Sequence, residues 1–318
     1  MRTVVVNKSQ GFGDLIYSTP TMRKIREFFP SDEIELYTHV PEVFEGSPYV
    51  NKVVQITPST SARFTEIVRG ARLLVPFDLP VATQRRLCTS IISLIDLQAL
   101  LAIDRTLPER EHYCDLYWQH EQSWVAEQIK KLNIDVNRLV VLHAGKTWPT
   151  RTFPDSVYFA TLDGLVSLGY QVVLVGKSST HAPNVFDPAR PNVLNLVNKL
   201  SLHQTAALCD VARVVLATDS GLLAIARCTD AKVISIHTCV EPYYRRQWRG
   251  GATGSMLHRW YPMHNNTCRC YDGLDVSMDI YNCPKKNFRC FPSADQILEH
   301  VDFVVKTELD TFQYGWDL

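Results

Sequence analysis

The sequence lacks an excess of charge of either sign and lacks a long hydrophobic run. Lysine plus arginine and aspartate plus glutamate each number 33, so the formal net charge is zero. A neutral chain is not typical of proteins that coat nucleic acid through bulk charge, although a local basic patch stays open. The longest apolar stretch, residues 87–103, is interrupted by Ser90, Ser93, Asp96 and Gln98 and is too polar to span a bilayer. We therefore expect a cytoplasmic protein, with peripheral contact to a membrane left open.

We expect neither a secretory leader nor a disulfide scaffold. Only a three-residue apolar run, Val4–Val6, precedes Lys8 and Asp14, so no secretory hydrophobic region fits there. Nine cysteines are an odd number, which does not favour a fully paired disulfide framework. The length of 318 residues predicts about two domains, each able to bury a core without covalent support.

Short apolar runs alternate with helical patterns along both halves of the chain. The expected strands lie at 4–6, 34–36, 53–56, 73–75, 139–142, 172–175, 214–217 and 233–236. Helical patterns end near 29, cover 85–103, 122–132 and 158–168, and begin at 201, 221 and 293. Strands separated by helices predict an α/β fold with two doubly wound parallel sheets, divided near residues 133–138. Ligands of such sheets bind at the carboxyl ends of the strands.

The first strand-to-helix turn contains Gly11 and Gly13, whose missing side chains allow close approach of a ligand. Asp14 follows at the expected helix start, where it could act as a general base or simply cap the helix. The letters G-F-G-D-L-I also resemble the start of a dinucleotide-binding fingerprint. Ile16 replaces its third glycine, so the evidence for a nicotinamide enzyme is weak.

Two further turns of this kind follow strands in the second half. The first contains Gly145, which permits close approach, and Lys146 and Arg151, whose charges suit a diphosphate. The second, Asp219–Gly221, offers backbone N–H groups and a serine hydroxyl to a phosphate. A solvated loop and ordinary helix capping are the alternatives. Three such turns converging on one cleft indicate a binding site more strongly than any one of them.

Two carboxy-terminal segments leave alternatives open. The cysteines at 268, 270, 283 and 290 could form a tetrahedral zinc site, but their spacing is tight and irregular. A disulfide and unligated buried thiols are the other interpretations. Residues 243–249, Y-Y-R-R-Q-W-R, could form a solvated loop, contact a donor or stack on nucleic-acid bases.

Five segments in order carry a resemblance to a known family. They read GFGDLIYSTPTMRKIREFFP, PEVFEGSPYVNKV, VLHAGKTWPTRTFP, LGYQVVLVG and ATDSG. In this order they resemble glycosyltransferase family nine, the lipopolysaccharide heptosyltransferases. The resemblance covers roughly residues 1–57 and 139–305 and matches residues 58–135 poorly.

The resemblance implies a GT-B fold, in which two Rossmann-like domains face each other across a central cleft. It implies an amino-terminal acceptor domain at 1–135, a donor domain at 136–291, and a final helix at 292–318 that packs back on the first domain. The implied reaction is an inverting transfer from a nucleotide-diphosphate sugar to an acceptor hydroxyl, with no essential metal and no other cofactor.

The resemblance also implies roles for individual residues. Asp14 matches the catalytic base, and Arg151 stands where the family usually has a lysine that neutralises the departing diphosphate. Thr147 matches a phosphate-binding position. The donor-binding residues expected in this way are Gly13, His143, Gly145, Lys146, Thr147, Gly176, Asp219, Ser220 and Gly221.

Two departures from the family pattern concern the donor. Ala224 stands where the family usually has a histidine, and the segment after Gly176 lacks an acidic residue that often contacts the nucleoside. The donor sugar, the nucleoside and the oligomeric state therefore stay open. The acceptor hydroxyl could belong to a glycan, to a lipopolysaccharide core or to a hydroxylated DNA base, and a non-catalytic sugar-nucleotide-binding protein is the remaining alternative.

Overall fold

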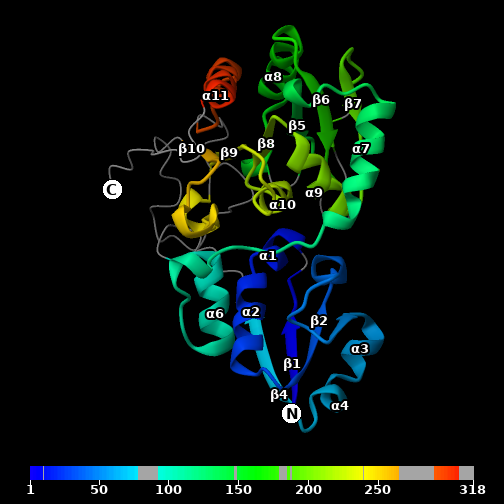
Figure 1. Ribbon diagram of the computed structural model, residues 1–318, viewed down its shortest axis with the longest axis vertical. Helices are drawn as coiled ribbons and strands as arrows, with labels where there is room; N and C mark the ends of the chain where they lie inside the picture. Colours follow the sequence, from blue (N-terminus) through cyan, green and yellow to red (C-terminus); the bar gives the residue numbers. More distant parts are fainter. Residues whose placement is uncertain are drawn as a thin grey trace.

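The computed structural model describes residues 1–9, 11–77, 92–146, 149–178, 185–186, 188–238, 240–264 and 290–307. Figure 1 shows two parallel β-sheets, one toward each end of the molecule, with the short helices α1 and α10 between them. Within the described part of the chain, no helix combines the length and apolarity needed to cross a bilayer.

The amino-terminal sheet has the strand order β3-β2-β1-β4, and all of its strands are parallel. Its strands are β1 (Arg2–Asn7), β2 (Glu33–Thr38), β3 (Lys52–Gln55) and β4 (Arg72–Phe77). Strand β1 reads as an unbroken apolar run because helices and neighbouring strands bury both of its faces. The four strands expected from the sequence in this half are confirmed.

Helix α2 (Thr19–Phe28) begins with Pro20 in its first turn and ends just before Pro30, as the sequence predicts. The other helices of this half are α1 (Phe12–Ile16), α3 (Pro58–Ala62), α4 (Phe64–Val68) and α6 (Leu94–Ile103). The first part of the helix expected at 85–103 lies outside the described residues.

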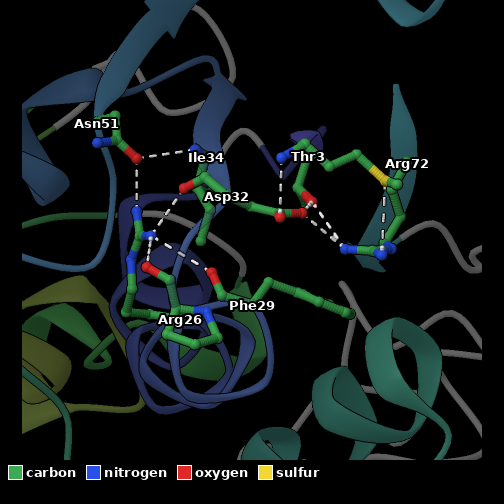
Figure 2. A network of polar contacts seen from close by, with 9 residues as sticks. Thr3, Arg26, Phe29, Asp32, Ile34, Asn51 and Arg72 are labelled. Carbon is green, nitrogen blue, oxygen red and sulfur yellow. Dashed lines mark hydrogen bonds and ion pairs between the residues drawn. The ribbon is translucent and has the colours of Figure 1, made fainter. Parts of the chain in front are cut away.

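A polar network fixes the connection from α2 to β2 (Figure 2). It lies at the amino ends of strands β2 and β4. Arg26 donates hydrogen bonds to the carbonyl oxygens of Phe29 and Asp32 and to Oδ1 of Asn51. The carboxylate of Asp32 in turn accepts from Arg72 of β4 at 2.8 Å. This network joins α2 and β4 to the residues that directly precede β2 and β3, and it lies apart from the strand ends that carry the candidate site.

The carboxy-terminal sheet has the order β10-β9-β8-β5-β6-β7 and is also fully parallel. Its strands are β5 (Leu139–His143), β6 (Gln171–Val175), β7 (Val193–Asn195), β8 (Val214–Thr218), β9 (Val233–His237) and β10 (Trp260–His264). The four expected strands are confirmed. The sequence did not reveal the two edge strands, because β7 is very short and β10 contains Pro262, which an edge strand tolerates.

The remaining helices begin largely where the sequence predicts. They are α7 (Gln122–Lys131), α8 (Asp155–Ser167), α9 (Leu202–Val211), α10 (Gly221–Ala226) and α11 (Ala294–Lys306). Ser201 and Ser293 form capping boxes with the glutamines three residues later. Gly169 follows α8 with φ +82°, the left-handed conformation that glycine permits after a helix. Single 3₁₀ turns occur at Pro41–Phe44, Glu109–Glu111, Gln119–Glu121, Val136–Arg138, Pro149–Arg151 (η5), Pro242–Arg245 (η6) and Gly251–Thr253.

Helix α11 packs against α8 and strand β8 of the carboxy-terminal sheet. The expectation that the final helix returns to the amino-terminal domain is therefore wrong for residues 294–306. The physical reason is a matched surface: Ile297, Val301 and Val304 are fully buried, and Leu298 packs where a side chain at Gly164 of α8 would collide. Residues 308–318 lie outside the described part of the chain.

The two halves share a hydrophobic core. Leu15 and Ile16 of α1 are buried in one cluster with Leu222 and Ala224 of α10. Helix α7, which precedes the expected boundary, packs on α9 of the second half. The strand ends that carry Asp14 and Asp219 are therefore held close together by apolar packing.

Candidate active site

The candidate site lies where α1 meets α10. Helix α1 follows β1 and carries Asp14, whereas Asp219 follows β8 and directly precedes α10. Because both strands are parallel members of their sheets, both turns lie at carboxyl strand ends, where α/β proteins bind ligands. Figure 1 shows the two helices side by side between the sheets, in agreement with their packing contacts.

Two glycines allow this close approach. A Cβ at Gly13 would lie 3.3 Å from Cα of Gly221, and a Cβ at Gly221 would collide with the ring of Phe12. Ala224, which replaces the family's usual histidine, contributes to the same surface, 3.7 Å from that Cβ position on Gly13. The small residues of the predicted donor turn therefore serve the packing between the two halves.

Four charged side chains form a chain across the two halves, which we call the charge relay: Asp14, Arg245, Asp219 and Arg151. Arg245 donates from Nη1 to Oδ1 of Asp14 at 2.9 Å and from Nε to Oδ1 of Asp219 at 2.8 Å. Arg151 donates from Nη1 to Oδ2 of Asp219 at 2.9 Å. Signs alternate along the relay, so every charge has an opposite neighbour.

Burial makes these contacts strong. The side chain of Asp219 is 2% exposed and that of Arg245 10%, whereas Asp14 is 33% exposed. Burial alone raises the pKa of Asp219, but Arg245 and then Arg151 outweigh it and hold that pKa well below its usual range. Burial lowers the pKa of Arg245, and Asp219 and Asp14 together raise it well above its ordinary value. Asp219 and Arg245 are therefore both ionised at neutral pH. Asp14 is the relay member most accessible to a ligand.

The segment at 243–249 is not the solvated loop that the sequence left open. Tyr244, Arg245 and Gln247 are buried, and the N–H of Trp248 donates to the carbonyl of His112 at 2.8 Å. Arg246 approaches Asp96 of α6 at 3.6 Å. This segment joins the two halves, so most of its side chains are not placed to stack on nucleic-acid bases.

His143 lies at the end of β5, with Nδ1 3.2 Å from Oγ1 of Thr218. Burial lowers the pKa of His143 to about 4, and the neighbouring positive charge of Arg151 adds to the effect. The imidazole is therefore neutral at pH 7. Gly145 lies over it, because a Cβ there would come within 2.7 Å of Nε2, and a Cβ at Gly176 would be 3.0 Å from the N atom of Gly145.

Lys146 contacts residues outside the relay. Its Nζ pairs with Asp155 at 3.0 Å and lies 3.9 Å from the centre of the Phe186 ring. The Oγ of Ser220 is buried and has no hydrogen bond among the described residues. Of these two predicted donor-binding residues, only Ser220 lies beside the relay.

Four predicted site residues fall outside the described part of the chain: Thr147, Cys268, Cys270 and Cys283. Cys290 is described and is partly buried. Elsewhere in the described ranges, no three His, Cys, Asp or Glu side chains gather closely enough to hold a metal ion. The zinc interpretation thus stays a prediction about residues that the structure does not describe.

Sequence reasoning missed the central residue of the relay. Arg245 stood out only as one of several basic residues in 243–249, and nothing local distinguishes it from Arg246. Its place shortly after the carboxyl end of β9 was the one available signal, because that end faces the same edge of the sheet as Asp219.

A known family resembles this chain in sequence, and solved structures resemble it in fold. The model of glycosyltransferase family 9 (heptosyltransferase) matches residues 90–272. No curated protein has a matching sequence.

Among solved structures, a family 9 glycosyl transferase from Veillonella parvula aligns with TM-score 0.64 and 12% identity over 96% of this chain and 97% of its own. The E. coli ADP-heptose lipopolysaccharide heptosyltransferase II gives 0.64 and 15% over 95% and 98%. The iron-containing dodecameric glycosyltransferase TibC of enterotoxigenic E. coli gives 0.64 and 16% over 96% and 76%. The arrangement of two facing parallel sheets is therefore common to these proteins.

Proposed function

The chain belongs to glycosyltransferase family 9 and is a glycosyltransferase, and we propose that it performs an inverting transfer from a nucleotide-diphosphate sugar with Asp14 as the general base. The acceptor is a hydroxyl group of a glycan or of a lipopolysaccharide core. ADP-heptose is the first donor to test, because it is named for the E. coli relative. The alanine at position 224 keeps other sugars in the test.

In the proposed reaction, Asp14 accepts the proton of the acceptor hydroxyl while that oxygen attacks the anomeric carbon. The bond from the anomeric carbon to the diphosphate oxygen breaks as the new glycosidic bond forms, and the nucleoside diphosphate leaves with the electron pair. Attack from the face opposite the leaving group inverts the anomeric centre. The transition state resembles an oxocarbenium ion, as in glycoside hydrolysis.

The observation that carries this proposal is the charge relay. It joins an accessible carboxylate of the first half to the buried Arg245 and the partly buried Arg151, beside the turn at Asp219 of the second half. Arg151, with its planar group of N–H donors, suits a diphosphate and would stabilise the charge that develops on it. The buried hydroxyl of Ser220, which has no hydrogen bond among the described residues, is a further donor toward the same group.

Positive charge at the diphosphate comes from arginine in this proposal, and no metal ion is assigned a step. We therefore expect turnover to be unchanged by EDTA. Loss of activity with EDTA, restored by a divalent cation, would contradict this part of the proposal. The proposal assigns no step of the reaction to the cysteines at 268, 270, 283 and 290.

The direct test incubates the purified protein with ADP-heptose, ADP-glucose, UDP-glucose and GDP-mannose and measures release of nucleoside diphosphate. We expect release from at least one donor, and about a 1,000-fold lower kcat in Asp14→Asn, because a positioned general base contributes on this order. Calorimetry with the matching nucleoside diphosphate should give the same Kd for both proteins.

Lys24→Gln is the control, because Lys24 of α2 pairs with Glu27 and Glu111, and the reaction uses none of these side chains. Full turnover by Asp14→Asn would remove Asp14 from the role of base. A wild-type protein that binds a nucleoside diphosphate but releases none from any donor would favour the non-catalytic alternative.

A further inference from the structure

Arg245 has no role in the reaction as proposed above, yet it contacts both carboxylates of the relay. Nη1 lies 2.9 Å from Asp14 and Nε lies 2.8 Å from Asp219. These two nitrogens belong to one rigid planar group, so the guanidinium sets the position of one carboxylate relative to the other. No lysine could make both contacts with this geometry, because its ammonium is a single point of charge.

The backbone of Arg245 is also held by the first half. The hydroxyl of Tyr17, three residues after Asp14, donates to the carbonyl oxygen of Arg245 at 3.1 Å. The guanidinium lies 5.4 Å from the centre of the Tyr17 ring and 5.1 Å from that of Tyr244. Main chain and side chain of Arg245 are therefore both fixed to the turn that carries Asp14.

Arg245 contacts only one of the two carboxylate oxygens of Asp14. Oδ1 accepts from Arg245, while Oδ2 accepts no hydrogen bond from the described residues. The backbone carbonyl of Asp14 is fixed as well, because Nε2 of Gln98 donates to it at 2.9 Å. The side chain of Asp14 is 33% exposed, so the carboxylate that carries this second oxygen is accessible to a ligand.

We infer that Arg245 is a positioning residue for the transfer: it holds the Asp14 carboxylate with Oδ2 directed to the acceptor hydroxyl and fixes that orientation relative to Asp219 on the donor side. The inference rests on the proposed function, because it takes Asp14 as the base. Arg245 touches none of the reacting atoms. Its loss should therefore lower kcat much more than it raises the KM for the donor.

Two other roles make different predictions. An arginine that only joins the two halves would behave like its neighbour Arg246, which pairs with Asp96 across the same boundary. An arginine that binds the diphosphate directly would raise the donor KM and weaken nucleoside diphosphate binding. The comparison of kcat with KM, and of Arg245 with Arg246, separates the three roles.

The experiment compares Arg245→Gln, Arg245→Lys and Arg246→Gln with the wild type, using the donor that gives the fastest release in the panel named above. We expect kcat to fall about 100-fold in Arg245→Gln, because misplacing a catalytic group by about an ångström costs on this order. The donor KM should change less than about threefold. The kcat of Arg245→Lys should lie between those of the wild type and Arg245→Gln. Arg246→Gln should keep the wild-type kcat.

The double variant Asp14→Asn, Arg245→Gln tests whether Arg245 acts through Asp14. If it does, adding Arg245→Gln to Asp14→Asn should lower the residual kcat no further, since residues that act as a unit are non-additive. A further 100-fold loss in the double variant would overturn the inference, and so would a wild-type kcat in Arg245→Gln. If Arg245→Gln does not fold, a wild-type kcat in Arg245→Lys overturns it.

These outcomes are distinct from a failure of the proposed function. Full turnover by Asp14→Asn, or no release from any donor by the wild type, would overturn the function and the inference together. A low kcat in Asp14→Asn together with a wild-type kcat in Arg245→Gln would overturn only the inference about Arg245. The role of Asp14 as general base would stand.

Discussion

At the scale of single residues, Asp219 is the group on which the arrangement of charges depends. It is almost fully buried and faces two arginines, so its carboxylate balances charges that could not otherwise be buried. The ion pair between Asp219 and Arg245 also holds Arg245 beside Asp14. Asp219 therefore contributes both to the stability of the fold and to the proposed chemistry.

Replacing Asp219 with Asn should lower the free energy of unfolding by about 3–5 kcal/mol at pH 7, because it leaves the buried Arg245 and the partly buried Arg151 without their shared partner. Urea unfolding followed by circular dichroism measures this. Asp302→Asn is the matched control, because Asp302 forms an exposed ion pair with Lys306 whose loss should cost less than about 1 kcal/mol. A cost for Asp219→Asn as small as that of the control would contradict the strength that we assign to the relay.

His143 should make stability depend on pH. Burial, aided by Arg151, lowers its folded pKa to about 4, whereas an unfolded histidine has a pKa of about 6.5. Between these values the unfolded chain binds a proton that the folded protein does not. Stability from this group is therefore complete above about pH 6.5 and is lost as the pH falls toward 4.

Replacing His143 with Gln should make the unfolding free energy less dependent on pH between 6 and 5, by about 1 kcal/mol per pH unit. Chemical denaturation at a series of pH values gives this slope, and only the slope decides, since the substitution also changes packing. An unchanged slope would show that His143 titrates normally in the folded protein. His237 has a pKa lowered to about 4 by burial as well, so part of the wild-type slope should remain in the variant.

At the scale of elements, the contact of α1 with α10 brings the two halves of the site together. Neither helix is long, and each has a glycine at the contact, Gly13 in α1 and Gly221 in α10, which lets the main chains approach. The ring of Phe12 lies over Gly221, and Gly13 lies against the same residue. The position of Asp14 relative to Asp219 therefore depends on Gly13 and Gly221, which take no part in the proposed reaction.

Replacing Gly221 with Ala should destabilise the protein by about 1–3 kcal/mol, because the added methyl group collides with the ring of Phe12. Thermal unfolding measures the loss. The second substitution Phe12→Ala should recover part of it by making room, so the two changes should be less than additive. A variant as stable as the wild type, with unchanged turnover, would show that this contact does not set the site.

Much at this scale was predictable from the sequence, and the misses have physical causes. Buried parallel strands are continuous apolar runs, so β1, β5, β8 and β9 could be recognised from their letters. The capping serines at 201 and 293 gave the starts of two helices. The packing partner of α11 could not be predicted, because an apolar helix face fits any apolar surface and only the fold shows that α8 offers a glycine there.

At the scale of the whole molecule, two parallel sheets face each other through their strand ends, and the GT-B expectation is confirmed. The sequence could predict Asp14, Arg151 and Asp219 as candidates because each follows a recognisable strand. It could not predict the relay, because Arg245 is 231 positions from Asp14 along the chain and meets it only through the fold. Long-range pairing of this kind leaves no local pattern.

The central claim is that a base in the first half faces a diphosphate site in the second. The most direct measurement is a crystal structure of the protein with the nucleoside diphosphate that it binds best. We expect a phosphate oxygen at a hydrogen-bond distance of about 2.7–3.2 Å from the Arg151 guanidinium, with Asp14 facing the same space. A diphosphate bound elsewhere, or an Asp14 carboxylate turned away from it, would contradict the account.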